Sequence, residues 1–169
     1  MEFVKKNIIA ILCVISLVAL VFTWGEFTTT ASVDVEGFES SSSGSQSFGG
    51  FTAAMSTIFG YLLIIGPVAL IAMNYVKQLE EKKGLLAIAV PVLCIVAWIL
   101  VVMGADSIAA AGSAAAAGAS VKTEVSLSFG AYLALISYIA TGIAGALTFH
   151  GAKVKALKEK GESFVKKSK

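Results

Sequence analysis

Long apolar runs without charged residues alternate with polar stretches along this chain. The hydrocarbon core of a bilayer is roughly 30 Å thick and is crossed by about 20 helical residues, so a run of this length predicts a membrane span. We therefore predict an all-α membrane protein whose single domain, residues 1–169, forms a four-transmembrane-helix bundle. The predicted spans are residues 7–24, 51–75, 85–103 and 127–149.

The lysines are distributed unevenly between the polar stretches. A fifth crossing within 107–121 is disfavoured because this alanine-rich run is short and weakly apolar. With four crossings, every lysine except Lys122 lies on the side of the two termini, and cytoplasmic segments carry the excess of Lys and Arg. We predict a multi-pass plasma-membrane protein with both termini cytoplasmic, outer loops at 25–50 and 104–126, and a basic cytoplasmic tail at 150–169.

Each predicted outer loop contains a stretch in which apolar and polar residues alternate strictly, within 27–36 and 121–129. This is the pattern of a half-buried strand. Two strands alone are marginal in water, so support must come from the helices, from further strands in the serine-rich part or from a neighbouring subunit. We predict a small extracellular β-sheet built from the two outer loops. The candidate interaction residues are Val33, Val35, Val121, Val125 and Leu127.

Two other polar stretches predict connections. Residues 39–50 are rich in serine and glycine, which is the composition of a flexible linker. We predict a mobile tether there, and the alternative is a tip that becomes ordered when it meets a partner. The alanine-rich run at 107–121 is predicted to be an external connector.

Small residues recur at near-heptad spacing in the fourth predicted span and let helices approach closely. They serve either packing within the bundle or an interface between protomers, and both readings stay open. Pro67 and Pro91 are expected to bend the second and third spans, since proline removes a backbone donor. The candidate helix-packing residues are Gly130, Ala134, Ser137, Thr141 and Gly145.

Composition excludes several kinds of chemistry. Hydrophobic residues make up 57% of the chain and charged residues 14%, which is too apolar for an ordinary soluble domain. All 13 basic residues are lysine, so bidentate recognition of phosphate is missing and no nucleic-acid partner is predicted. The single histidine and the buried Cys13 and Cys94 supply no metal or haem ligand set. We predict no catalytic, metal or cofactor site, and no enzyme.

The lysine-rich tail at 150–169 has two interpretations. It is either only an orientation signal or also a contact for anionic lipid, to which each lysine near the surface adds roughly 1 kcal/mol.

Four predicted spans, internal termini and two outer segments that each supply a strand resemble the claudin and peripheral-myelin-protein tetraspan architecture. In the stretch "TWGEF", Trp24 and Gly25 match part of that family's outer-loop signature, while its Gly-Leu-Trp and its two cysteines are missing. The last span also looks like the last helix of small bacterial tetraspan proteins. The resemblance implies a topology only, and no functional residue is carried over.

The predicted function is that of a non-enzymatic integral membrane structural or interaction protein. Its partners are membrane lipid and either further copies of itself or a membrane complex to which it is accessory, contacted through the outer strands. The alternative is an oligomeric channel or pore subunit, in which Ser56, Thr57 and Asn74 form a polar stripe that faces water.

Overall fold

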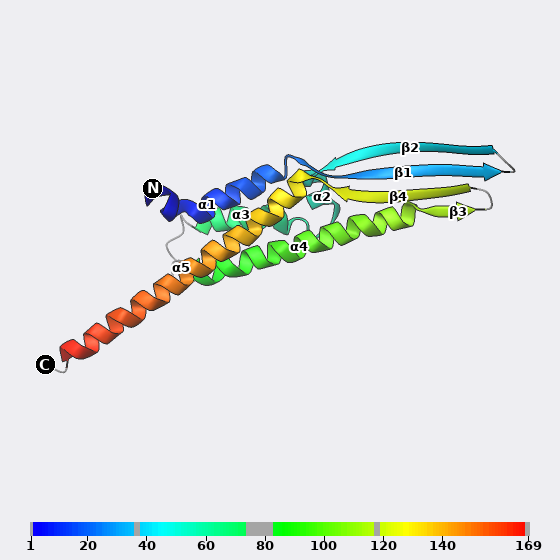
Figure 1. The fold of residues 1–169 in the computed structure, drawn as a ribbon. Helices are drawn as coiled ribbons and strands as arrows, with labels where there is room; N and C mark the ends of the chain where they lie inside the picture. The colour runs from blue at the N-terminus through cyan, green and yellow to red at the C-terminus, as the bar shows by residue number, and fades with distance from the viewer. Residues whose placement is uncertain (1, 36–37, 74–82, 117–118, 168–169) are drawn as a thin grey trace.

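The computed structural model describes residues 2–35, 38–73, 83–116 and 119–167, with side chains for 7–34, 39–73, 84–113 and 119–151. The described chain forms helices at one end and an antiparallel sheet at the other (Figure 1). The helices are α1 (Glu2–Ala19), α2 (Gly50–Ser56), α3 (Leu62–Met73), α4 (Lys83–Gly112) and α5 (Phe129–Lys167). The strands are β1 (Thr23–Val35), β2 (Phe38–Gly49), β3 (Ala114–Ala116) and β4 (Ala119–Leu127).

The predicted all-α, four-helix membrane bundle is wrong. Among the described residues, two helices are long and apolar enough to cross a bilayer: Gly84–Gly112 within α4 and Phe129–Gly151 within α5, whose most apolar 18-residue windows have mean hydropathies of 3.1 and 1.6. The other apolar helices, Asn7–Ala19 and Leu62–Met73, are shorter than a bilayer requires. The fold is therefore mixed α/β, and the tetraspan description does not apply.

The first predicted span fails because the helix ends at Ala19. Residues 20–22 form a turn, and Trp24 already belongs to β1. The indole N–H of Trp24 donates a hydrogen bond of 3.0 Å to the carbonyl oxygen of Ala19 and so satisfies a group at the end of α1. An apolar run thus contains a helix end that hydropathy alone does not reveal.

The second predicted span is divided at residues 57–61. Thr57 is extended, with φ −135° and ψ 152°, and its hydroxyl oxygen accepts a hydrogen bond of 3.1 Å from the N–H of Gly60. A Cβ atom on Gly60 would lie 2.1 Å from the carbonyl oxygen of Ala54, so only glycine fits this turn. The interruption therefore comes from a threonine–glycine turn, while Pro67 lies inside α3.

The third predicted span lies within a longer helix, and the fourth does so from Phe129 onward, because Leu127 ends β4. α4 continues past Met103 to Gly112, and α5 continues past Phe149 to Lys167. The run predicted to be an external connector therefore contributes the last turns of α4 and then β3. Alanine has the highest helix propensity of all residues, which agrees with this extension.

β1 is a central strand in the sheet order β2-β1-β4-β3, and all neighbours are antiparallel. The two stretches predicted as strands pair directly, with Phe27 opposite Val125 and Ala31 opposite Val121, so their apolar sides coincide. The predicted tether is wrong, because the serine-rich stretch is β2 and pairs with β1 along its whole length. Backbone pairing satisfies its polar groups whatever its side chains are.

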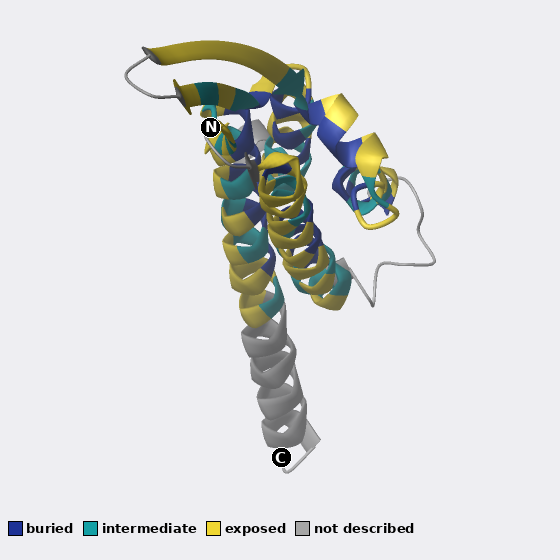
Figure 2. Ribbon diagram, turned by 90° about the vertical axis from the view of Figure 1, so that its right-hand side faces the viewer, coloured by how far each residue is buried: buried dark blue, intermediate teal, exposed yellow. Residues whose placement is uncertain are grey.

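The main core lies where the helices meet the base of the sheet. Its largest fully buried side chains include Leu20, Trp24 and Leu63, and it continues along α4 and α5 through Ala97 and Ala134. Figure 2 shows buried residues between the helices and exposed residues on their outer sides. The core thus fixes the direction in which the sheet leaves the helices.

Candidate functional site

The four-stranded sheet, which we call the arm, projects beyond one end of the helices (Figure 1). The hairpin of β1 and β2 reaches farthest, because these strands have 13 and 12 residues whereas β4 has 9. Strands of this length exceed the usual five or six residues. The arm is therefore the largest feature of the described chain that the helix packing does not explain.

The strand register places four of the predicted interaction residues on one face of the arm. Leu127 pairs with Gly25 at the base and packs against the helical core, and Val125 is half-buried opposite Phe27. Farther out, Val121 is half-buried, and Val33 is 42% exposed. The side chain of Val35 lies outside the described residues. The outward half of this face is the part open to a partner.

The opposite face of the arm is polar. The hydroxyl groups of Ser32 and Ser120 lie 2.7 Å apart, and Lys122 forms an ion pair with Glu124. The hydrogen bond from Lys122 holds the pKa of the Glu124 carboxyl below its usual value. These side chains suit a face in water.

The two edges of the arm differ. At the β4 edge, β3 pairs with the outer end of the strand, and nearer the base the N–H of Thr123 donates a hydrogen bond of 2.9 Å to the hydroxyl oxygen of Ser113, just beyond α4. At the other edge, β2 has no further partner among the described strands, and residues 39–47 are exposed throughout. Its sequence contains neither proline nor lysine, the usual devices that block pairing at an edge. β2 can therefore accept another strand through backbone hydrogen bonds.

Sequence reasoning kept further strands in the serine-rich part as one possible support of the sheet, but predicted a mobile tether there because it followed side-chain composition. The available signal was the position of Glu36-Gly37 between a strongly alternating stretch and a second stretch of similar length. Two residues with glycine between potential strands favour a hairpin. Serine-rich composition concealed the second strand.

The small residues of the fourth predicted span lie in contacts within the chain. A Cβ atom on Gly130 would lie 2.7 Å from the carbonyl oxygen of Thr23, and one on Gly145 would lie 2.3 Å from that of Ala87. Ala134, Ser137 and Thr141 are also buried. Of the two roles left open for these small residues, packing within the chain and an interface between protomers, the described contacts show the first, with α5 packed against its own neighbours.

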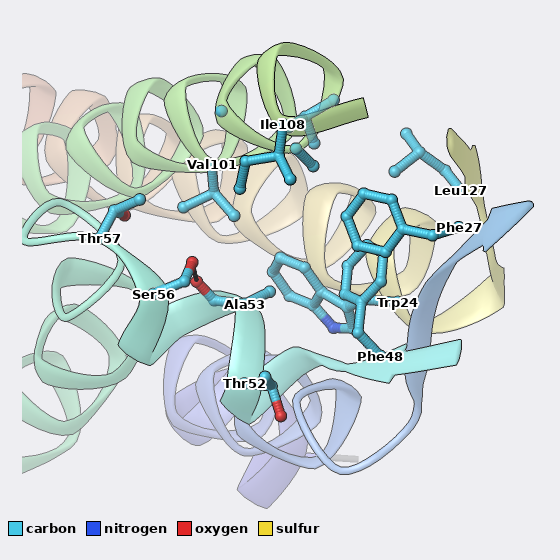
Figure 3. A pocket seen from close by; sticks show the side chains of 13 residues that line it. Trp24, Phe27, Phe48, Thr52, Ala53, Ser56, Thr57, Val101, Ile108 and Leu127 are labelled. Atoms are coloured by element: carbon cyan, nitrogen blue, oxygen red, sulfur yellow. Dashed lines mark hydrogen bonds between the residues drawn. The ribbon is translucent and has the colours of Figure 1, made fainter. Parts of the chain in front are cut away.

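A pocket of about 150 Å³ lies between the base of the arm, α2 and α4 (Figure 3). Trp24, Phe27 and Phe48 form its aromatic wall, and the rings of Phe27 and Phe48 have centroids 5.0 Å apart. Val101 and Ile108 of α4 lie opposite. Sequence reasoning missed this pocket, because its walls come from segments far apart in the chain.

Groups for metal or acid–base chemistry are sparse where the structure describes side chains. No cluster of three or more His, Cys, Asp or Glu residues there is arranged to hold a metal ion. Cys13 and Cys94 are buried free thiols, and His150 is exposed. The lack of an enzymatic activity and of a cofactor stays a prediction.

No protein-family model matches this chain, and no curated protein matches it. The resemblance to claudin-type proteins therefore stays a prediction. Function has to be inferred from the arm and from the pocket at its base.

Proposed function

We propose that this protein is a non-enzymatic membrane-anchored adhesion or scaffold protein, which binds a second copy of itself through the free edge of β2. In this proposal α4 and α5 are the membrane anchor, and the arm stands outside the membrane. The open β2 edge is the observation that carries the proposal.

The surface of the helices supports membrane anchoring. In the most apolar windows of α4 and α5, 33% and 28% of the residues are buried within the chain, so these helices differ from the mostly buried core helix of a soluble protein. Large apolar side chains such as Ile99, Ile136 and Leu147 are exposed. Soluble proteins rarely expose contiguous apolar patches of more than a few hundred Å², whereas lipid covers such surfaces favourably.

The positions of the lysines support an outward-facing arm. α4 and α5 are antiparallel, because Gly84 near the start of α4 lies against Phe149, and Gly145 lies against Ala87. The basic tail and the start of α4 are therefore on the same side, opposite the arm, and only Lys122 lies on the arm. Since cytoplasmic segments are enriched in lysine, this distribution supports a cytoplasmic tail and an arm outside the membrane.

The charge pattern of β2 favours antiparallel pairing of two copies. Glu39, near the tip of the arm, is the only charged residue of this strand. Antiparallel pairing places the Glu39 residues of the two copies at opposite ends of the new ladder, whereas parallel pairing in register places them side by side. Because the strands continue outward from the helices (Figure 1), antiparallel pairing puts the two helical anchors at opposite ends. The two copies then belong to facing membranes.

Crosslinking between two sets of proteoliposomes tests this proposal. Single cysteines replace Ser41, Ser43, Ser45 or Ser47 in a variant without Cys13 and Cys94, and each vesicle set carries a differently tagged protein. Antiparallel pairing predicts crosslinks between vesicles that are strongest near Ser43 and weaker toward Ser47.

Other outcomes separate the alternatives. Similar crosslinking at all four positions within one vesicle indicates parallel association in the same membrane. Monomers at every position contradict self-association, and an accessory role then requires a different protein partner. The channel alternative stays a prediction: Ser56 and Thr57 line the apolar pocket, and Asn74 lies outside the described residues.

A further inference from the structure

We infer that the pocket at the base of the arm binds the alkyl chain of a bilayer lipid. This inference rests on the membrane anchoring in the proposed function, but it does not depend on pairing of β2. The occupant is identified from the chemistry of the pocket wall, its size and the surface that it borders.

The wall offers carbon atoms and few free polar groups. The indole N–H of Trp24 is engaged by the carbonyl oxygen of Ala19 at 3.0 Å, so the ring presents its carbon surface to the pocket. The hydroxyl of Ser56 donates to the carbonyl oxygen of Ala53 at 2.7 Å, and that of Thr57 accepts from Gly60. Figure 3 shows the hydroxyl of Thr52 turned away from the pocket. No buried side-chain nitrogen or oxygen in the described part of the chain lacks a partner. Such a wall selects against a polar ligand.

The size of the pocket suits part of an apolar chain. Its volume of about 150 Å³ is comparable to that of engineered apolar cavities that stay dry and bind benzene or xenon. An ordered water needs two to four polar partners, and this wall supplies too few. An apolar occupant is therefore favoured over water.

The pocket borders helix surface that the proposal assigns to lipid. Ile108, which lines the pocket, is 63% exposed, and Met103 on α4 and Met55 on α2, which lie near lining residues in the sequence, are exposed as well. At 1.5 Å per residue, Val101 and Ile108 lie about 26 and 36 Å along α4 from Gly84. The hydrocarbon core is roughly 30 Å thick, so the pocket is near its outer boundary. The upper part of a chain from the outer leaflet fits this height.

Trp24 provides a direct reporter of occupancy. The chain has two tryptophans, so W98F leaves Trp24 as the only one. Nanodiscs containing this variant are prepared with increasing fractions of phosphatidylcholine brominated on one acyl chain, and the same variant in detergent is titrated with dibromostearate. Bromine in contact with the indole ring quenches its fluorescence. We expect saturable quenching by the lipid, reversed by unbrominated lipid of the same length.

Pocket-filling variants separate specific binding from general contact with lipid. A105F and G104L place side chains in the pocket, and a Cβ on Gly104 meets nothing within 4 Å. Filling the space of a few methylene groups is expected to raise the fraction of bromolipid at which quenching is half-saturated by about tenfold or more. A110F, on an exposed position of the same helix, is the matched control and should behave like the parent. If W98F does not fold, the wild-type protein is used, and its Trp24 component is read from the same titration.

The inference is overturned if quenching rises linearly with bromolipid without saturation, or if A105F and A110F respond alike. It is also overturned if only free dibromostearate binds, because the bilayer lipid is then not the occupant. Flotation of the protein with the lipid tests the anchoring separately. A protein that floats without saturable quenching refutes only the pocket inference, and one that does not float refutes the proposed function.

Discussion

The hydroxyl of Tyr138 donates a hydrogen bond of 3.0 Å to the carbonyl oxygen of Leu63, which joins α5 to α3. Leu63 lies four residues before Pro67, so its carbonyl is the one that loses a helical donor to the proline ring. α4 repeats this relationship, because Ala87 lies four residues before Pro91, and its carbonyl is approached closely by Gly145. Both carbonyl groups freed by proline thus face α5.

Y138F should leave the Leu63 carbonyl without a donor in an apolar core and destabilise the protein by about 1 kcal/mol. In P67A, the new backbone N–H can donate a hydrogen bond to this carbonyl, so Y138F should lower the free energy of unfolding by less in the P67A background. Unfolding of all four proteins in the double-mutant cycle, followed by circular dichroism in denaturant, measures the coupling. Additive effects would contradict the assigned pairing.

G145A and G142A form a matched pair on α5. A Cβ on Gly145 would lie 2.3 Å from the Ala87 carbonyl oxygen, whereas one on Gly142 makes an ordinary contact of 3.6 Å with Pro91. We expect G145A to destabilise the protein by about 1–3 kcal/mol through overpacking. G142A should be neutral or stabilising by up to about 1 kcal/mol, since alanine favours the helix. Melting temperatures in one detergent give the comparison, and equal effects would argue against the close approach of α4 and α5.

Proline substitutions at two adjacent positions test the free edge of β2. Successive N–H groups of a strand point to opposite edges. One of the two variants S42P and S43P therefore removes a donor to β1, and the other removes a donor at the free edge. One variant should lose stability of the hairpin, and the other should stay folded but lose vesicle-to-vesicle crosslinking. Hydrogen exchange of β1 amides distinguishes the two. If both variants keep the stability of the hairpin and the vesicle-to-vesicle crosslinking, the role of this edge is contradicted.

Glutamine in place of the lysines in the tail at 150–169 tests whether the tail contacts anionic lipid. If it does, partition of the isolated tail peptide to vesicles containing phosphatidylserine should weaken by roughly 1 kcal/mol per lysine replaced, and less at high salt. A peptide with the same lysines in scrambled order is the control for sequence-independent charge. Equal partition of the lysine and glutamine peptides would leave the lysines as an orientation signal alone.

Local patterns in the sequence determined several elements. Apolar and polar residues alternate strictly in 27–35 and 121–127, and this alone predicts strands because successive side chains of a strand point to opposite faces. Both stretches are strands, with Phe27 beside Val125. The apolar run at 85–103 lies within α4, and the run at 127–149 lies within α5 from Phe129 onward, because a long apolar sequence without charged residues can bury its side chains along a whole helix.

Tertiary contacts decided the remaining features. The end of α1 at Ala19 depends on the indole of Trp24, and the division between α2 and α3 depends on the fit of Gly60 against Ala54. Serine-rich β2 is a strand because β1 supplies its hydrogen-bond partners, which no side chain of β2 specifies. The pocket exists only where the base of the arm meets α2 and α4. Hydropathy measures the preference of each residue for lipid or water, whereas these features arise from specific contacts between particular residues and strands.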